Sequence, residues 1–199
     1  MPDEVFAARA RWQRFDACPW LFWAESTPQE QAEQLAYQAF LTRSQGLVAG
    51  EGCYVSERAA VVATAEQPVE LGPRSYIAGQ AYVTGPVRLG SDCSVNSFAS
   101  LRGRVVCGDG VRIGAYSALI GFDHGFERLD WPVFRQPLTS RGVLMGDDVW
   151  VGAHVTVLDG VQVGHHTILA AGAVVTHDVP DTAIVAGNPA RLLRLRSQP

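Results

Sequence analysis

Five histidines are the side chains of this sequence best suited to acid–base chemistry: His124, His154, His165, His166 and His177. An imidazole titrates near neutral pH, so it can take a proton from a hydroxyl or an amine, and it can also bind zinc. Successive histidines stand 30, 11, 1 and 11 residues apart, and the four cysteines form no C-x-x-C pair. This spacing predicts no metal site. General acid–base chemistry is then the role open to a histidine that is not solely structural.

The elements that must position these histidines follow a six-residue repeat. Apolar residues recur at every sixth position in a series that we call the leading row: Leu71, Ile77, Val83, Leu89, Val95, Leu101, Cys107, Ile113 and Leu119, then Met145, Val151, Val157, Val163, Leu169 and Val175. A row of mostly small residues stands four positions later, from Ser75 to Ser117 and from Val149 to Val179. A shorter array upstream consists of Val55 and Val61 with Ala59 and Ala65.

A period of six fits neither an α-helix, which has about 3.6 residues per turn, nor a strand of alternating faces. It fits a short strand followed by a sharp turn, repeated along the chain. The leading residue then points inward and stacks on its equivalents in the neighbouring coils. The small residue lies where backbones crowd at a corner. Because one coil cannot bury its own apolar face, the stack forms a continuous core, and the sequence predicts a solenoid.

Two insertions interrupt the repeat. About four residues around 67–70 shift its frame, and residues 121–142 separate its two long stretches. A loop longer than about 12–15 residues without structure of its own is usually functional or disordered. The segment 121–142 contains three phenylalanines and a Trp-Pro pair, so we predict a folded arm that leans on a neighbouring subunit. His124 stands at the base of this arm.

Residues 1–46 lie outside the repeat. Thr27-Pro28-Gln29-Glu30 is a capping box with proline at the first helical position, and Gly46 is a stop signal, so we predict a helix over 28–44. Its apolar residues recur at helical spacing: Ala32, Leu35, Ala36, Ala39 and Phe40. A weaker helix is predicted over 3–15. The aromatic-rich residues 18–23 are expected to cap the open end of the coil stack, or else to shape an acceptor pocket or a subunit contact.

Composition and charge narrow the functional classes. The chain is 47% hydrophobic and 18% charged, with a net charge of −4, so no broad basic field favours nucleic acid or an anionic membrane. No apolar run reaches the roughly 18 residues that a membrane span needs, and we find no signal peptide. We expect the four cysteines to be reduced core thiols of a cytoplasmic protein: Cys18, Cys53, Cys93 and Cys107.

The patterns L-G-x-x-C/A-x and V-G-x-x-V-x resemble the repeat of the hexapeptide-repeat superfamily over about residues 50–196. This resemblance implies a left-handed parallel β-helix with three flat faces and one hexapeptide on each face. It also implies a homotrimer, because the CoA groove of the family lies between two subunits. We accordingly divide the chain into a helical and aromatic extension over 1–46, a β-helix domain over 47–187, and a tail or short helix over 188–199.

The segment from Cys107 to His124, followed by M-G-D-D-V-W-V-G at 145–152, resembles the maltose and galactoside O-acetyltransferase branch of this superfamily. In that branch a histidine before the loop is the catalytic base, which implies this role for His124. The alternative is a solvated loop histidine. Asp123 and Glu127 are the neighbouring carboxylates that we consider as partners orienting the imidazole.

Two departures from that branch alter the predicted acceptor site. The branch has an acceptor-binding asparagine where this sequence has Ser94, with Asn96 two residues later. An aspartate of the branch falls near Arg102. We therefore do not transfer sugar specificity, and we take Asn96 as a candidate catalytic contact to the acceptor.

Three C-terminal motifs follow the order and spacing of the superfamily: G-D-D-V-W-V-G at 146–152, A-A-G-A-V-V-T-H-D-V-P at 170–180 and G-N-P-A-R-L-L-R at 187–194. By this resemblance the expected acyl-CoA contacts are Trp150, Ala153, Ala171, Thr176, His177, Arg191 and Arg194. Small residues let a pantetheine arm approach the backbone, and arginines suit phosphates. The alternatives are that Trp150 merely covers a face and that the two arginines form a solvated tail. His177 stands where relatives usually have lysine.

These observations predict an acetyl-CoA-dependent acyltransferase that acylates a hydroxyl or an amine of a small molecule such as a sugar, without a cysteine nucleophile and without a metal. A γ-class carbonic anhydrase, which shares the fold, is disfavoured because the histidine intervals contain no H-x-x-x-x-H pair. A non-catalytic scaffold or binding module on the same solenoid is the second alternative. Binding of CoA distinguishes the scaffold from the enzyme.

Overall fold

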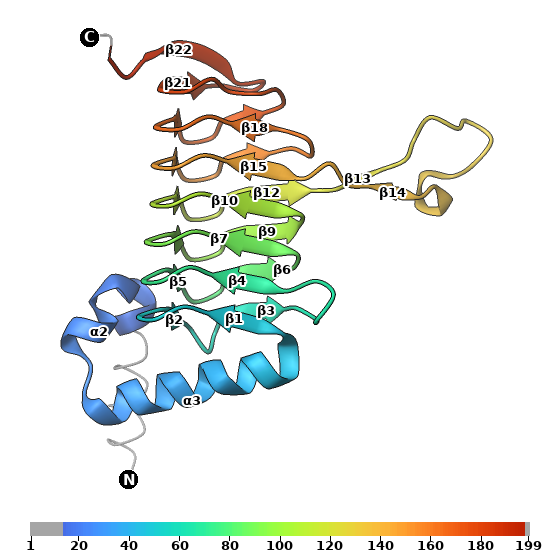
Figure 1. Cartoon of the computed structure of the whole chain (residues 1–199). Coiled ribbons are helices and arrows are strands. Elements are labelled where there is room, and N and C mark those ends of the chain that lie inside the picture. The colour runs from blue at the N-terminus through green and yellow to red at the C-terminus, as the bar shows by residue number, and fades with distance from the viewer. Residues whose placement is uncertain (1–13, 198–199) are drawn as a thin grey trace.

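The computed structural model describes residues 14–197 and shows three parallel sheets wound into a β-helix (Figure 1). Sheet A contains β1 (Leu47–Ala49), β4 (Val69–Leu71), β7 (Val87–Leu89), β10 (Val105–Cys107), β15 (Val143–Met145) and β18 (Gln162–Val163). Sheet B contains β2 (Tyr54–Val55), β5 (Tyr76–Ile77), β8 (Ser94–Val95), β11 (Arg112–Ile113), β16 (Trp150–Val151), β19 (Ile168–Leu169), β21 (Ala183–Ala186) and β22 (Arg191–Leu195). Sheet C contains β3 (Ala60–Val62), β6 (Tyr82–Thr84), β9 (Ser100–Gly103), β12 (Ala118–Gly121), β17 (Thr156–Val157) and β20 (Val174–Val175). Up to β20, and apart from β13 and β14, which form a separate two-stranded sheet, consecutive strands belong to sheets A, B and C in turn, so three strands make one coil, as predicted.

The leading row forms the core. All fifteen of its side chains are at most 5% exposed. The strand registers stack them on one another: Leu71 pairs with Leu89, Leu89 with Cys107, and Cys107 with Met145 beyond the inserted arm. Stacking of equivalent residues from successive coils makes the core continuous, because each coil buries the apolar face of the next. The predicted fold class is confirmed.

The first insertion lies earlier in the chain than predicted. It forms a turn between β3 and β4, in which the backbones of Thr64 and Gln67 hydrogen-bond each other in both directions. Ala63 is buried and Ala65 is exposed, so the prediction that Ala65 belongs to the small-residue row is wrong. The cause is that the frame shift begins directly after β3, whereas Glu70 already pairs within sheet A.

The predicted helix is present as α3 (Pro28–Gln45), with the Thr27–Glu30 capping box and with Gly46 in the left-handed conformation at φ 68°. The apolar residues that recur at helical spacing do not form its buried face. Leu35 and Phe40 are 55% and 53% exposed. The two alanines between them, Ala36 and Ala39, are also exposed. The buried residues are instead Gln34, Gln38 and Leu41.

The buried residues of α3 are glutamines because the helix covers the first coil. The backbone of this coil has no further coil to pair with, so its N–H and C=O groups need polar partners. The Gln34 side chain donates from Nε2 to the carbonyl oxygen of Val55 at 3.0 Å, and its Oε1 accepts from the Val55 N–H at 2.9 Å. Gln38 donates to the carbonyl oxygen of Cys53 at 2.8 Å and to Gln34 Oε1 at 2.9 Å. These amides replace the missing strand and close the open end of the stack (Figure 1).

The aromatic segment packs beside sheet B at the first coils (Figure 1), and Trp23 reaches the open end, so the cap that we predicted there is only partly present. It forms η1 (Pro19–Leu21) and α2 (Phe22–Glu25). The Phe22 ring packs on Tyr54 of sheet B with centroids 4.8 Å apart, and the indole of Trp23 donates to the carbonyl oxygen of Cys53 at 3.1 Å. The helix α3 covers the rest of the open end of the coil stack. Residues 14–17 are helical, and the rest of the helix predicted over 3–15 lies outside the described residues.

The C-terminal tail is a strand, so the short helix considered for 188–199 is wrong. The strand β22 runs antiparallel to β21 and pairs Ile184 with Arg194. It occupies the last free edge of sheet B, where its N–H and C=O groups find partners that a helix would not supply. Between residues 14 and 197, no helix combines the length and the apolar character needed to cross a membrane.

Candidate functional site

The candidate catalytic residue lies at the root of the inserted arm. The chain leaves sheet C after β12, and β13 (Asp123–His124) pairs antiparallel with β14 (Leu138–Thr139), with His124 opposite Leu138. Ser140 Oγ donates to the carbonyl oxygen of Gly121 at 2.6 Å and ties the two sides of the root together. The arm projects from the stack on the same side as the β3–β4 loop (Figure 1). His124 is therefore an exposed side chain on a paired backbone.

The distal part of the arm is folded, as predicted. It contains η2 (Val133–Arg135), and the buried amide of Gln136 donates to the carbonyl oxygens of Arg128 and Trp131 at 2.8 and 3.0 Å. Several apolar side chains nevertheless face solvent: Phe126, Leu129, Val133 and Phe134.

His124 differs from the other histidines in having an unengaged ring. The other four imidazoles are held by neighbours: His154 stacks on Tyr116, His165 accepts from the Asp147 N–H, His166 contacts Asp148 and His177 contacts Thr176. No residue of the described chain hydrogen-bonds the His124 ring. Its two ring nitrogens are thus available to a ligand.

The carboxylates considered as orienting partners bind the backbone instead. Asp123 Oδ1 accepts from the backbone N–H of His124 at 2.8 Å, and Glu127 Oε2 accepts from that of Phe126 at 3.1 Å. Asp123 therefore holds the strand that carries the imidazole but does not touch the imidazole. The sequence alone could not show whether these carboxylates contact the imidazole or the backbone.

A buried carboxylate that sequence reasoning missed anchors the returning side of the arm. The Asp159 side chain is 4% exposed. It accepts from the backbone N–H groups of Arg141 and Gly142 at 3.0 and 2.7 Å. The sequence could have indicated it by the Leu158-Asp159-Gly160 tripeptide, which forms a corner of the coil that follows the arm. Through these bonds Asp159 fixes the root on which His124 stands.

A cavity of about 420 Å³ lies below this root. It is lined by the β3–β4 loop, by the ends of β3, β6 and β9, and by the root of the arm: Val62, Ala63, Thr64, Gln67, Thr84, Gly85, Pro86, Arg102, Gly103, Arg104, Phe122, Leu138, Thr139 and Ser140. We call it the root cavity. Leu138, the strand partner of His124, belongs to its wall. Both insertions thus contribute to one cavity, because both leave the coil at the corner that follows sheet C.

Asn96 stands at a different corner. It follows β8 of sheet B, whereas His124 follows β12 of sheet C one coil later. Its amide donates to the carbonyl oxygen of Ile113 at 2.8 Å, and its Oδ1 accepts from the Tyr76 hydroxyl at 3.3 Å. Within one chain the structure does not bring Asn96 together with His124, and it gives the Asn96 amide a structural task between two coils.

Three of the predicted CoA contacts come together at the C-terminal end of the stack. Thr176, His177 and Arg191 line a cavity of about 360 Å³, which we call the C-terminal cavity. The Thr176 hydroxyl and His177 Nδ1 are 2.8 Å apart. The exposed Arg191 guanidinium is bonded only locally, to the carbonyl oxygen of Ala190. This cavity therefore offers donors suited to phosphate oxygens.

The other predicted CoA contacts lie elsewhere on the chain. Trp150 is 58% exposed on the outside of sheet B, in register with Ile168, Ile184 and Arg194. Ala153 and Ala171 occupy the corner between sheets B and C in adjacent coils.

That corner is closely packed. A Cβ added to Gly152 would lie 2.7 Å from the Ala171 nitrogen, so only glycine fits there. The predicted set thus occupies three surfaces of one chain.

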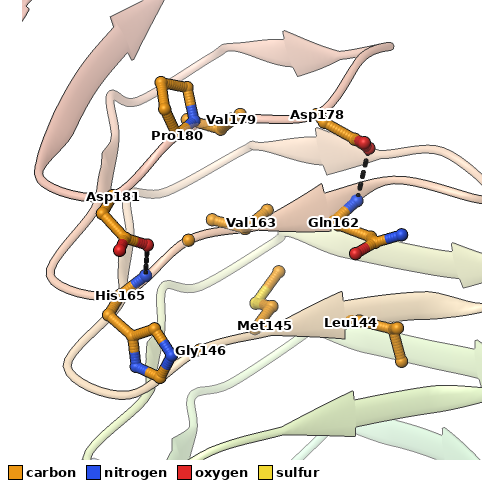
Figure 2. A pocket seen from close by; sticks show the side chains of 11 residues that line it. Leu144, Met145, Gly146, Gln162, Val163, His165, Asp178, Val179, Pro180 and Asp181 are labelled. Atoms are coloured by element: carbon orange, nitrogen blue, oxygen red, sulfur yellow. Dashed lines mark hydrogen bonds between the residues drawn. The ribbon is translucent and has the colours of Figure 1, made fainter.

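A further cavity contains none of the predicted site residues. It has a volume of about 640 Å³ and lies beside the end of sheet A; Figure 2 shows the side chains that line it. Asp178 and Asp181 accept from the backbone N–H groups of Gln162 and His165 at 2.8 and 2.7 Å (Figure 2). After β20 the chain makes only one β-bridge to this sheet, at Val179, so the two carboxylates replace the missing strand. Their role is structural.

The described part of the chain contains no group of three or more histidine, cysteine, aspartate or glutamate side chains placed to hold a metal ion. Three of the four cysteines are buried in the core, and Cys18 is partly exposed. Burial raises the pKa of the Cys107 thiol.

Comparison with known proteins supports the repeat. Residues 142–177 match the family described as bacterial transferase hexapeptide (six repeats), which confirms the predicted hexapeptide repeats. A 2,3,4,5-tetrahydropyridine-2,6-dicarboxylate N-acetyltransferase of Staphylococcus aureus is 46% identical over 63 residues, which are 32% of this chain and 26% of that protein. The chain thus spans about a quarter of the length of the curated relatives that it matches.

Solved structures share the fold over most of the chain. A hexapeptide-repeat acetyltransferase of Vibrio cholerae in complex with acetyl-CoA is 25% identical, with a TM-score of 0.57 over 96% of this chain and 88% of that one. The N-acyltransferase AntD of Bacillus cereus, a mutant in complex with dTDP and CoA, has a TM-score of 0.70 at 19% identity over 81% of this chain and 89% of its own. The maltose and galactoside branch remains a prediction.

Proposed function

We propose that this chain of hexapeptide repeats is a CoA-dependent acyltransferase, with acetyl-CoA as donor and a hydroxyl or amine of a small molecule as acceptor. The observation that carries the proposal is the unengaged imidazole of His124 on a fixed strand beside an open cavity. The names of the similar proteins support it, since they are N-acetyltransferases or acyltransferases.

His124 supplies the base that this chemistry needs. An alcohol is a poor nucleophile at neutral pH, and a neutral imidazole can accept the proton of an alcohol, or of a neutral amine, as attack proceeds. The acceptor oxygen or nitrogen then bonds to the acyl carbon while the carbon–sulfur bond breaks. The proton held by His124 passes to the departing thiolate, so the enzyme returns to its starting state. No enzyme thiol takes part, consistent with the burial of Cys53, Cys93 and Cys107.

The C-terminal cavity fits the nucleotide end of acyl-CoA. Phosphates suit an arginine fork and hydroxyl donors, and this cavity combines Arg191 with Thr176 and His177. The crowded corner at Ala153 and Ala171 leaves backbone groups accessible to a narrow pantetheine arm. The acetyl-CoA complex of the Vibrio cholerae protein supports this donor.

We further propose a homotrimer working in the cytoplasm. The predicted CoA contacts lie on several surfaces of one chain, and a neighbouring subunit would join them into one groove. The apolar side chains of the arm, such as Phe126, Leu129 and Phe134, would pack on that neighbour. Sedimentation equilibrium measures the assembly directly: a monomer at micromolar concentration would contradict the proposal. The free thiols are consistent with a reducing compartment.

The donor site is tested first by calorimetric titration with acetyl-CoA. We expect wild type to bind and the R191A/R194A variant to bind more weakly. The exposed Arg43 at the end of α3 provides the control R43A, which should bind like wild type. Absence of binding to any acyl-CoA would remove the enzyme proposal and favour the non-catalytic scaffold.

The catalytic role is tested by replacing His124 with alanine and measuring thiol release once an acceptor is found. We expect a loss of about 10²–10⁴-fold in rate, the usual contribution of a positioned base. Thermal stability and acetyl-CoA affinity should stay near wild type because the ring has no partner in the described chain. His154→Ala is the matched control, since it removes another exposed imidazole. Loss of the trimer in the His124 variant would instead assign that residue a structural role.

A further inference from the structure

We propose that the root cavity binds an anionic group of the acceptor, a carboxylate or a phosphate, and so selects charged acceptors over neutral ones. The inference rests on the proposed function, because it names the substrate class of the same site. Its basis is a pair of arginines, Arg102 and Arg104, in a cavity next to the candidate base.

The charge of the root cavity is uncompensated. Neither aspartate nor glutamate occurs among its described lining residues. Seven other arginines form ion pairs with nearby carboxylates: Arg14, Arg58, Arg74, Arg88, Arg128, Arg141 and Arg196. Across residues 14–197, Arg102 and Arg104 form no such pair. In a chain of net charge −4, two unpaired cations in one cavity form a local site for an anion.

Aromatic contacts orient one of these cations without using its donors. The Arg102 guanidinium carbon lies 5.3 Å from the centroid of the Phe122 ring and 5.9 Å from that of Tyr82. Such contacts are attractive through the ring face. A guanidinium has five N–H donors in a fixed fork that matches a carboxylate or phosphate. The aromatic contacts therefore limit the motion of Arg102 and leave its hydrogen-bonding edge free.

The root cavity adjoins the strand that carries the candidate base, His124. Leu138 and Thr139 line it and pair with His124 and Asp123 across the hairpin. Directly opposed residues of an antiparallel pair are about 4.5–5.5 Å apart between Cα atoms. An acceptor whose anionic group sits on the arginines thus places its hydroxyl or amine near the imidazole.

The remaining walls fit the body of a small molecule. Phe122, Leu138 and Pro86 present apolar surface, and the hydroxyls of Thr84 and Thr139 add neutral hydrogen-bonding groups. At about 420 Å³, the space is within the range of small-molecule sites. The geometry points to a monomeric acceptor with one anionic group a few bonds from its nucleophile.

The test compares sugars that differ in charge: glucose 6-phosphate, glucuronate and glucose, titrated calorimetrically into wild type and into R102Q/R104Q. We expect wild type to bind at least one charged sugar about tenfold or more tighter than glucose, and the double variant to lose this preference. Whichever anion binds better identifies phosphate or carboxylate as the preferred group. The control is R135Q, since Arg135 also stacks on a phenylalanine but lies outside the cavity.

Three results would overturn the inference: equal binding of charged and neutral sugars by wild type, a preserved preference in R102Q/R104Q, or loss of acetyl-CoA binding in that variant, which would assign the cavity to the donor. The unfolding temperature of the variant checks its fold. If R102Q/R104Q unfolds, the single variants R102K and R104K are measured instead. Each keeps the positive charge but removes the forked N–H donors of the guanidinium, so the comparison tests whether the fork binds the anion. Charge preference in a protein that binds no acyl-CoA would leave the anion site standing while removing the enzyme proposal. Acyl transfer without charge preference would do the reverse.

Discussion

Removing the Asp159 carboxylate should destabilise the root of the arm and with it the position of His124. Asp159→Ala leaves the backbone N–H groups of Arg141 and Gly142 without partners in a largely buried place. Each buried donor left unpaired costs about 1–3 kcal/mol, and water entering the root offsets part of this. We therefore expect the free energy of unfolding to fall by about 2–4 kcal/mol.

Urea denaturation measures this loss, and hydrogen exchange locates it. The amides of residues 138–143 should exchange faster in the variant, while those of the coil core far from the arm should be less affected. Asp178→Ala is the matched control. That carboxylate also accepts from a backbone N–H, of Gln162 at 2.8 Å, but it is exposed. Its loss should cost about 1 kcal/mol or less, because water can replace it. Equal losses in both variants, with unchanged exchange in the arm, would refute the anchoring role of Asp159.

Three further predictions concern the ends of the stack and the core. Gln34→Ala should lower the free energy of unfolding by about 2–4 kcal/mol, since it strands the N–H and C=O of Val55 under α3; a Gln29→Ala control, on the exposed side, should change little in the same urea titration. Hydrogen bonds from His166 and Arg196 hold the pKa of Asp148 below its ordinary value, so their contribution to stability is complete above about pH 4 and is lost as the pH falls through the lowered pKa; Asp148→Asn should flatten the pH dependence of thermal unfolding in that acidic range, and an unchanged profile would contradict this. Because burial raises the pKa of the Cys107 thiol, little thiolate forms at pH 8, and mass spectrometry after alkylation should find Cys107 unlabelled until the protein is unfolded.

Much of the fold could be predicted because the repeat is local and redundant. Every leading position from Leu71 to Val175 carries the same information, so single departures do not hide it. The errors fell where that redundancy ended. Ala65 was assigned to the small-residue row because the frame shift was placed after it. The apolar residues of α3 recur at helical spacing, which normally indicates a buried face, yet Leu35 and Phe40 are exposed. Here the open backbone edge of β2 required amides, so Gln34 and Gln38 are buried instead.

The candidate site was predicted only in its parts. The family resemblance and its position before an insertion made His124 a candidate base, and the C-terminal motifs made Thr176, His177 and Arg191 candidate CoA contacts. What the sequence did not reveal is which of these residues meet. The two insertions are far apart along the chain, and only the winding of the coils places them at one corner, where Arg102 and Arg104 share a cavity.

By itself, then, the sequence determined the coil, its core and the boundaries of the arm, because apolar spacing and capping signals act between residues near one another in the chain. The tertiary structure alone decided that the end of the stack is closed by glutamines, that Asp159 holds the arm, and that two arginines, which form no ion pair within residues 14–197, share a cavity with Leu138, the strand partner of His124. These features depend on contacts between coils and on which backbone groups remain unpaired at an edge. The local pattern of residue types predicts neither the contacts between coils nor the backbone groups that remain unpaired.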